Sequence, residues 1–332
     1  MPGKSEHSLD QLTEQIQLVR SEIGKIIVGH QEVVDGVLIA LLAGGHVLLE
    51  GVPGLGKTTL LRTLARALQL KYSRIQFTPD LMPADIVGSM VMETLDGGIK
   101  NLRFQPGPIF AHLVLADEIN RATPKTQSAL LEAMQERTVT SGTVTHELEE
   151  PFLVMATQNP LEMEGTYPLP EAQLDRFLMK ILVGYPTRAE LNVIVERTMA
   201  AAQPQLDRVV DRDQILNIRR AARDVLVAEH VRNFATHLIL ATQPDQADAH
   251  PLAKKFIRYG SSPRGAQALI QSGRVLALMR RRWNVSIDDL RGLALACIRH
   301  RIILNFDGHA EGKTADWLIS EIMANMAVAA PS

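Results

Sequence analysis

Residues Gly51 to Thr58 read GVPGLGKT, which fits the phosphate-loop pattern of glycine, four residues, glycine, lysine and serine or threonine. The segment follows an apolar run at 46–49 and precedes a helix-like segment at 59–68. Glycines let backbone N–H groups turn inward around phosphates, and the helix N-terminus adds its positive dipole end. We therefore expect Lys57 to reach the β- and γ-phosphates of a nucleotide and Thr58 to hold Mg²⁺. The residues expected to line the nucleotide here are Gly51, Pro53, Gly54, Leu55, Gly56, Lys57, Thr58 and Thr59.

Two acidic residues follow a second apolar run. Residues 111–116 form a continuous apolar segment without alternation, which is typical of a parallel strand covered on both faces. Asp117 and Glu118 come where that strand ends, at the edge where α/β sheets bind ligands. We predict that Asp117 holds Mg²⁺ and that Glu118 polarises the attacking water as a general base. The alternative is a solvated acidic pair at a strand end.

Asn159 follows a third apolar run, 152–156, and falls in the same row as Asp117 and Lys57. Its amide is expected to orient a water molecule near the γ-phosphate. The alternative is a turn-forming residue, because Asn-Pro favours turns.

Two arginines are further candidates. Arg176 precedes the last predicted strand, 178–183, and an arginine contributed in trans stabilises the charge of a transferring phosphoryl group. A surface pair with Asp175 is the alternative. Arg264 follows Ser262 and Pro263, which suit the N-cap and first position of a helix. A cation in the first turn opposes the helix dipole, so a nearby anion such as an ATP phosphate would explain it, although an exposed first-turn arginine is tolerated.

The elements that position these residues divide into two parts. Strands alternating with helices up to residue 186 predict an α/β domain with a parallel sheet at 1–186, preceded within it by two helices at 8–42. Prolines and a Gly97-Gly98 turn predict a hairpin inserted at about 78–108, and Ser141-Gly142 predicts a second hairpin at 138–145. A capping box of Thr187 and Glu190 opens an all-helical domain at 187–332. Its expected helices lie at about 187–202, 213–230, 233–242, 264–282, 286–303 and 314–328.

Composition narrows the class of protein. The 332 residues carry a net charge of −2, so there is no general attraction to nucleic acid. The first 187 residues are acidic and the remainder basic, which favours contact between the two parts, within one chain or between subunits. The single cysteine, Cys297, lies in an apolar pattern and is expected to be a buried small hydrophobe. With neither a signal peptide nor a stretch long enough to span a bilayer, we expect a cytoplasmic protein without a transmembrane segment.

Together these motifs resemble the AAA+ ATPases and, within them, the MoxR family, and the resemblance covers nearly the whole chain. It is carried by segments 51–58 (Walker A), 113–122 (Walker B and its continuation), 156–160, 169–177 and 262–265. The resemblance implies that Asn159 is sensor 1, Arg176 the arginine finger and Arg264 sensor 2. Arg264 is then expected to reach the phosphate loop of its own subunit from the helical domain. Arg121 is a second candidate for the contact with a neighbour's phosphate.

The same resemblance implies an architecture and a set of partners. It implies a homo-oligomeric ring, commonly a hexamer, with ATP and Mg²⁺ at each subunit interface. The insert at 78–108 is similar to the helix-2 insert of this clade, the hairpin at 138–145 is similar to its pre-sensor-1 hairpin, and Val28 and Gly29 match the segment that lines the adenine pocket. MoxR-like ATPases are chaperone-like and act on protein clients, often proteins with a von Willebrand factor A domain.

Two other functions stay open at this point. Related helix-2-insert proteins act on DNA, so a DNA-directed motor is one alternative, although a basic block is missing. A nucleotide-dependent scaffold with little turnover is the other, and the complete set of Lys57, Asp117, Glu118 and Asn159 disfavours it.

Overall fold

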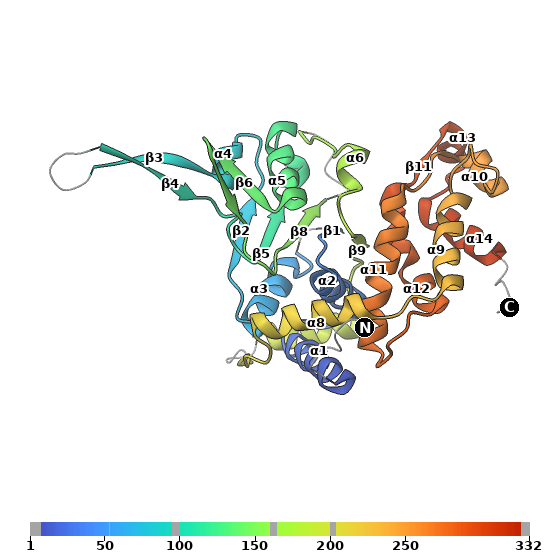
Figure 1. The fold of residues 1–332 in the computed structure, drawn as a ribbon, viewed down its shortest axis with the longest axis horizontal. Coiled ribbons are helices and arrows are strands. Elements are labelled where there is room, and N and C mark those ends of the chain that lie inside the picture. The colour runs from blue at the N-terminus through green and yellow to red at the C-terminus, as the bar shows by residue number, and fades with distance from the viewer. Residues whose placement is uncertain (1–7, 53, 95–99, 160–164, 200–203, 327–332) are drawn as a thin grey trace.

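The centre of the molecule is a five-stranded parallel sheet (Figure 1). The structure, a computed structural model, describes residues 8–52, 54–94, 100–159, 165–199 and 204–326. The strands are β1 (Val47–Glu50), β2 (Tyr72–Gln76), β5 (Leu113–Asp117), β8 (Leu153–Gln158) and β9 (Met179–Leu182), in the order β2-β5-β8-β1-β9. Every neighbouring pair is parallel, which confirms the predicted α/β core.

Alternate residues of the three central strands, β5, β8 and β1, face two separate hydrophobic cores. Along β1, Val47 and Leu49 belong to one core and Leu48 to the other, as the two-residue period of a strand requires. The first core includes residues of α1 (Leu9–Gly24), α2 (Gln31–Ala43), α3 (Lys57–Ala67) and α8 (Arg212–Asp224). The second includes residues of α4 (Pro83–Val87) and α5 (Pro124–Glu136). Helices thus cover both faces of the sheet, which explains its continuous apolar strands.

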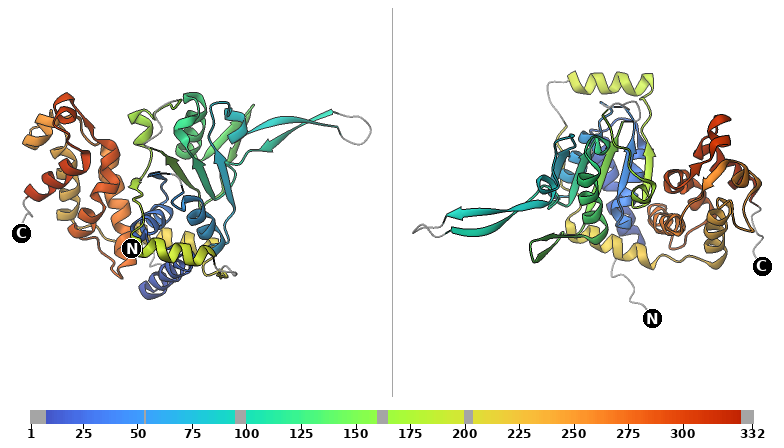
Figure 2. Two further views of the ribbon diagram at one scale, coloured as in Figure 1. Left: turned by 180° about the vertical axis from the view of Figure 1, so that it is seen from behind. Right: turned by 90° about the horizontal axis from the view of Figure 1, so that it is seen from above.

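Two antiparallel hairpins depart from this core, as the sequence predicts. The longer one pairs β3 (Gly88–Thr94) with β4 (Lys100–Pro106) and projects from the body on the side away from the C-terminal helices (Figures 1 and 2). The shorter one pairs β6 (Thr138–Ser141) with β7 (Val144–Glu147). The helical turn α4 between β2 and β3 was not expected. It is too short to produce a detectable helical period.

The chain beyond residue 187 is helical, as expected, but its helices do not form one body. The helices α7 (Arg188–Met199) and α8 lie against the α/β core, whereas α9 to α14 lie together on one side of it (Figures 1 and 2). The helices of this second group are α9 (Glu229–Ala241), α10 (Pro251–Phe256), α11 (Pro263–Met279), α12 (Ile287–Ile298), α13 (Phe306–Ala310) and α14 (Ala315–Asn325). We call this group the lid helices. The division at residue 186/187 stays a proposal.

The expectation of helices alone in this part was wrong in one detail. The strands β10 (Ile257–Tyr259) and β11 (Ile303–Leu304) form a two-stranded antiparallel sheet among the lid helices. Segments of two or three residues carry too little alternation to be recognised in a sequence. The pairing also joins residues far apart in the chain, which only the fold brings together.

Local sequence signals placed the starts of two of the lid helices correctly. Ser262 caps α11 with Pro263 in its first turn, and Ser286 and Asp289 form the predicted capping box of α12.

Cys297 is buried, as expected, and burial raises the pKa of its thiol to about 11. None of the described helices has the length and apolar character that a membrane span requires.

A buried histidine makes the stability of the sheet dependent on pH. The Nδ1 atom of His46 accepts from the Val154 amide at 3.0 Å, and its Nε2 atom lies 3.1 Å from the Met134 carbonyl. Because the carbonyl can only accept, Nε2 carries the proton and the ring is neutral. Burial lowers the pKa of His46 to about 4 from an ordinary value of 6.5.

We therefore expect acid to destabilise the fold through His46. The unfolded chain binds a proton at this ring near pH 6.5 and the folded chain only near pH 4, so the contribution is complete above pH 6.5 and disappears as pH falls toward 4. The loss is about 3 kcal/mol. Chemical denaturation of the parent and of His46→Gln at several pH values measures it. The gap in unfolding free energy between the two proteins should narrow from pH 6.5 to 4, and parallel curves would contradict the assignment.

Candidate functional site

The loop between β1 and α3 has the backbone that a phosphate-binding loop needs. Gly54 and Gly56 have φ values of +85° and +76°, a region that disfavours side chains. Gly51 is required by space, because a Cβ there would lie 2.6 Å from the Val183 carbonyl. The helix α3 begins at Lys57, so its N-terminus points into the loop. Pro53 lies outside the described residues.

A cavity of about 380 Å³ opens over this loop at the carboxyl edge of the sheet. It brings together the residues that the sequence places in one site. Its lining consists of Gly51, Gly54, Gly56, Lys57, Thr58, Thr59, Arg74, Asp117, Glu118, Thr157, Gln158 and Asn159. Strands β1, β5 and β8 end side by side here, which is why three distant segments of the chain meet.

Lys57 has the environment of a phosphate-binding cation. Its Nζ atom donates to the Gly51 carbonyl at 2.5 Å. Burial lowers the pKa of Lys57, and the carboxylates of Asp117 and Glu118 partly counteract that shift. A half-buried ammonium group has lost part of its hydration, and an anionic ligand such as a phosphate compensates for that loss through charge-assisted hydrogen bonds.

Asp117 is held by two donors from neighbouring strands. The Thr157 hydroxyl donates to its Oδ1 atom at 2.6 Å, and Arg74 Nη2 donates to its Oδ2 atom at 2.7 Å. Asp117 and Thr58 line the same cavity and both offer oxygen atoms, the ligand type that Mg²⁺ prefers. The donor set therefore fits the magnesium ion of a bound nucleotide.

Glu118 stands in a strained backbone conformation. Its φ is 56°, in the left-handed region, where a side chain costs of order 1–3 kcal/mol. The Glu118 amide donates to the Thr157 hydroxyl at 2.9 Å, and its carboxylate accepts from Gln76 at 2.9 Å and Arg121 at 3.0 Å. These bonds hold the carboxylate toward the cavity, as a general base requires. Asn159 is buried and lines the same cavity.

Four residues of this site were missed by sequence reasoning: Arg74, Gln76, Thr157 and Gln158. Arg74 and Gln76 are alternate residues of β2 and therefore lie on one face, and the register places Gln76 opposite Asp117. A polar residue at every second position of a strand beside the acidic pair was the available signal. Thr157, the last residue but one of β8, hydrogen-bonds both acidic residues.

A second cavity, of about 450 Å³, adjoins the first and shares Gly54, Gly56 and Thr59 with it. Apolar side chains dominate its lining, among them Ile26, Ile27, Val28, Leu55, Leu191 and Ile194. An apolar cavity beside a phosphate loop suits a nucleobase. Val28 thus lies where the adenine contact is expected. Gly29 adjoins Val28 in the chain, and a Cβ there would lie 2.2 Å from Glu190 Oε1.

The structure does not bring Arg176 and Arg264 to this cavity. Leu178, two residues after Arg176, donates its amide to the His46 carbonyl, which lies at the start of β1. The phosphate loop follows the other end of the same strand. Arg176 and Asp175 therefore lie at the amino edge of the sheet, opposite the phosphate loop. Arg264 Nη1 lies 3.9 Å from Asp175 Oδ2, so it lies at that edge too.

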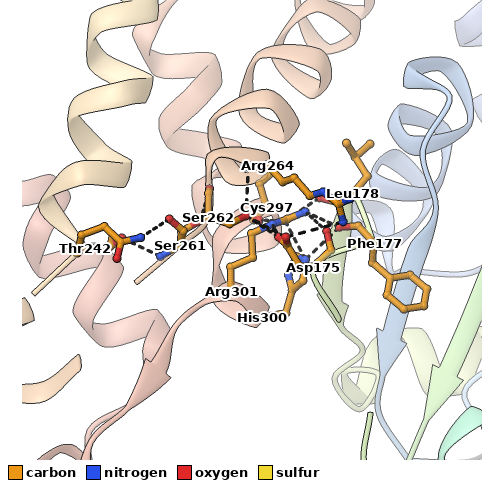
Figure 3. Close-up of polar contacts among 11 residues, drawn as sticks. Asp175, Phe177, Leu178, Thr242, Ser261, Ser262, Arg264, Cys297, His300 and Arg301 are labelled. Atoms are coloured by element: carbon orange, nitrogen blue, oxygen red, sulfur yellow. Dashed lines mark hydrogen bonds and ion pairs between the residues drawn. The ribbon is translucent and has the colours of Figure 1, made fainter. Parts of the chain in front are cut away.

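The expectation that Arg264 reaches its own phosphate site is thus not met in this arrangement. The physical reason is the attachment of the lid helices: they pack beside β9 and α6 (Glu171–Leu174), at the amino edge (Figures 1 and 3). Arg176 donates to the Leu131 carbonyl at 3.0 Å. Arg121 lies 3.0 Å from Glu118 and is the only one of the three candidate arginines among the described residues to contact the acidic pair.

The fold and site define a phosphate-loop NTPase core followed by a helical lid. Residues 46–179 match the family described as "ATPase family associated with various cellular activities (AAA)", and residues 250–322 match an AAA lid domain. Chaperone MoxR1 of Mycobacterium tuberculosis is 42% identical over 92% of this chain and 80% of its own length. Protein MoxR of Methylorubrum extorquens is 32% identical over 85% of this chain and 86% of its own length. The chain therefore belongs to the MoxR family of AAA+ ATPases.

A crystal structure of a protein from Cytophaga hutchinsonii agrees with the fold. It superposes with a TM-score of 0.90 at 39% sequence identity and covers 96% of each chain. The overall fold is thus shared with that protein.

Proposed function

We propose that this protein binds and hydrolyses ATP in a homo-oligomeric ring and uses the hydrolysis to remodel, activate or assemble partner proteins. The observation that carries the proposal is the cavity in which Lys57, Asp117 and Glu118 face the phosphate loop. A bound magnesium ion would neutralise phosphate charge, with Thr58 and Asp117 as the residues that hold it. Lys57 binds the phosphates, Glu118 accepts the proton of the attacking water and Asn159 orients that water.

The positions of Arg176 and Arg264 support a site shared between subunits. Phosphoryl transfer requires positive charge around the γ-phosphate, and an arginine often arrives from a neighbouring molecule. Both arginines lie at the edge of the sheet opposite their own cavity. A ring that repeats one head-to-tail contact can bring this edge of one subunit against the nucleotide edge of the next. We assign both arginines to the neighbour's nucleotide, and a hexamer is the ring we expect.

The long hairpin supplies a surface suited to protein clients. Met90 pairs with Phe104 and Met92 with Leu102 across the strands, so all four lie on one face. Phe104 stacks on His146, which covers the inner end, whereas Met92 and Leu102 are 63% and 60% exposed. Flexible methionine side chains on a projecting element adapt to varied apolar partners. This face and the name of the chaperone relative favour protein clients, with von Willebrand factor A domain proteins as the expected class.

Client capture by the hydrolysis-deficient variant tests this function. Glu118→Gln protein loaded with ATP should retain protein clients from a lysate of its own organism, identified by mass spectrometry. The double variant Met90→Ser with Met92→Ser, in the same background, should retain fewer of them while assembling normally. Salt-sensitive binding of DNA in place of proteins would instead favour the DNA-directed motor. A cytoplasmic location stays a prediction.

A further inference from the structure

A polar cluster centred on Asp175 joins the lid helices to the sheet (Figure 3). Asp175 immediately precedes Arg176 in the chain. Arg301, in the 3₁₀ turn after α12, donates from Nε to Asp175 Oδ1 at 2.8 Å. The hydroxyl of Ser262, the N-cap of α11, donates to the same carboxylate at 2.9 Å. Two separate parts of the lid, the turn after α12 and the start of α11, therefore donate hydrogen bonds to the same side chain of the core.

Arg301 also holds the backbone on both sides of Arg176. Its Nη2 atom donates to the Asp175 carbonyl at 3.1 Å and to the Phe177 carbonyl at 2.7 Å. His300 Nε2 lies 3.1 Å from the same Phe177 carbonyl. The Arg301 side chain is only 3% exposed. A single guanidinium group from the lid thus binds the backbone carbonyls of the two residues that flank Arg176 in the chain.

The ion pair between Arg301 and Asp175 fixes the orientation of the backbone around Arg176 more than it adds to the free energy of unfolding. A buried ion pair often stabilises a fold no better than apolar residues of the same volume, because both charges lose their hydration. What apolar residues cannot do is fix three acceptors at set directions, which the planar fork of an arginine does. The acceptors fixed here belong to the two residues on either side of Arg176, whereas the Arg176 side chain itself donates to a neutral acceptor, the Leu131 carbonyl.

We propose that Arg301 is a positioning residue for Arg176 and couples the lid of one subunit to the nucleotide of the next. The inference rests on the proposed function, because it assumes that Arg176 acts on the neighbour's ATP. A movement of the lid changes the position of Arg301, and Arg301 carries the backbone of Arg176 with it. The lid of each subunit then sets the hydrolysis rate at a site that it does not itself contain.

The substitution Arg301→Lys tests the coupling. Lysine keeps the charge beside Asp175 but lacks the fork that reaches the flanking carbonyls. We expect kcat for ATP to fall about 100-fold, as a misplacement of about 1 Å can produce, with little change in KM or in ring assembly. The matched control is Arg282→Lys, since Arg282 donates twice to the buried Asp289 within the lid. This control should keep the parent kcat, and an equal loss in both variants would overturn the inference.

Mixed rings show where Arg301 acts. Arg301→Lys subunits keep an intact cavity, and Lys57→Ala subunits keep an intact Arg176 segment. Mixing them should restore activity, because the first can receive Arg176 from the second. No recovery in rings shown to be mixed would overturn the inference.

The outcomes also separate the inference from the proposed function. If the parent protein shows no ATPase activity or forms no rings, the proposed function itself is wrong. A parent that loses activity through Arg176→Ala but keeps it through Arg301→Lys would reject the inference alone. If Arg301→Lys subunits do not assemble into rings, Ser262→Ala tests the coupling in their place, because it removes one hydrogen-bond donor to Asp175. A smaller loss of kcat that mixing restores supports the coupling, and an unchanged kcat contradicts it.

Discussion

Replacing Glu118 by glutamine should lower ATP turnover by about 10³-fold while ATP binding persists, because general base catalysis typically contributes 10²- to 10⁴-fold. The substitution keeps the shape of the side chain, and its amide oxygen can accept the bonds that Gln76 and Arg121 now donate. The phosphate loop and Lys57 are untouched, so nucleotide affinity should stay near the parent value. Rings assembled with ATP should then persist, because hydrolysis no longer dissociates them.

Steady-state ATPase assays, nucleotide-binding titrations and size measurements of the assembly check this expectation together. The control is Glu14→Gln, an exposed glutamate on α1 away from the cavity, which should behave like the parent. Turnover at the parent rate in Glu118→Gln would show that another group activates the water. A loss of ATP binding would instead indicate that the carboxylate maintains the shape of the strained turn at Glu118.

The second large effect concerns the arginine assigned to the neighbouring subunit. Arg176→Ala should reduce kcat by about 10³-fold or more, since an arginine supplied in trans contributes 10³- to 10⁵-fold in phosphoryl transfer. Its own cavity is complete, so affinity for ATP should change little. Mixing Arg176→Ala with Lys57→Ala subunits should restore part of the activity, because each supplies what the other lacks at a shared interface. An exposed lid residue, in Arg232→Ala, provides the control.

The same mixing experiment decides between Arg176 and Arg121. Arg121 lies 3.0 Å from Glu118 of its own chain. If Arg121 serves its own site, Arg121→Ala mixed with Lys57→Ala remains inactive, because every site then lacks one essential group. Recovery with Arg121→Ala, and none with Arg176→Ala in rings shown to be mixed, would transfer the trans role to Arg121.

Much of the nucleotide cavity could be predicted because its signals are local. Gly54 and Gly56 adopt backbone angles that glycine favours, and Lys57 opens a helix directly after them. The acidic pair and Asn159 each follow a buried apolar strand. In a parallel sheet all strands end at one edge, so the order of such segments along the chain already implies that they meet.

Other parts of the site depend on contacts that local patterns do not contain. Arg74 and Gln76 belong to the site only because β2 lies beside β5, and the strand order is decided by packing across the whole sheet. Whether Arg264 faces its own cavity or the edge of the sheet opposite to it depends on where the lid helices pack against the core. A helix start can be recognised from Ser262 and Pro263, but the edge of the sheet on which that helix rests cannot.

The phosphate loop, the acidic pair and the family were therefore determined by the sequence itself, through short segments whose conformation depends on their own residues. The separation of Arg264 from its own cavity was decided only by the tertiary structure, whereas Arg176 lies at the opposite edge because it precedes a parallel strand. The separation of Arg264 is caused by a set of long-range contacts, above all the partly buried hydrogen bonds from Arg301 and Ser262 to Asp175. The free energy of these bonds depends on groups that are 87 to 126 residues apart in the chain and become neighbours only on folding.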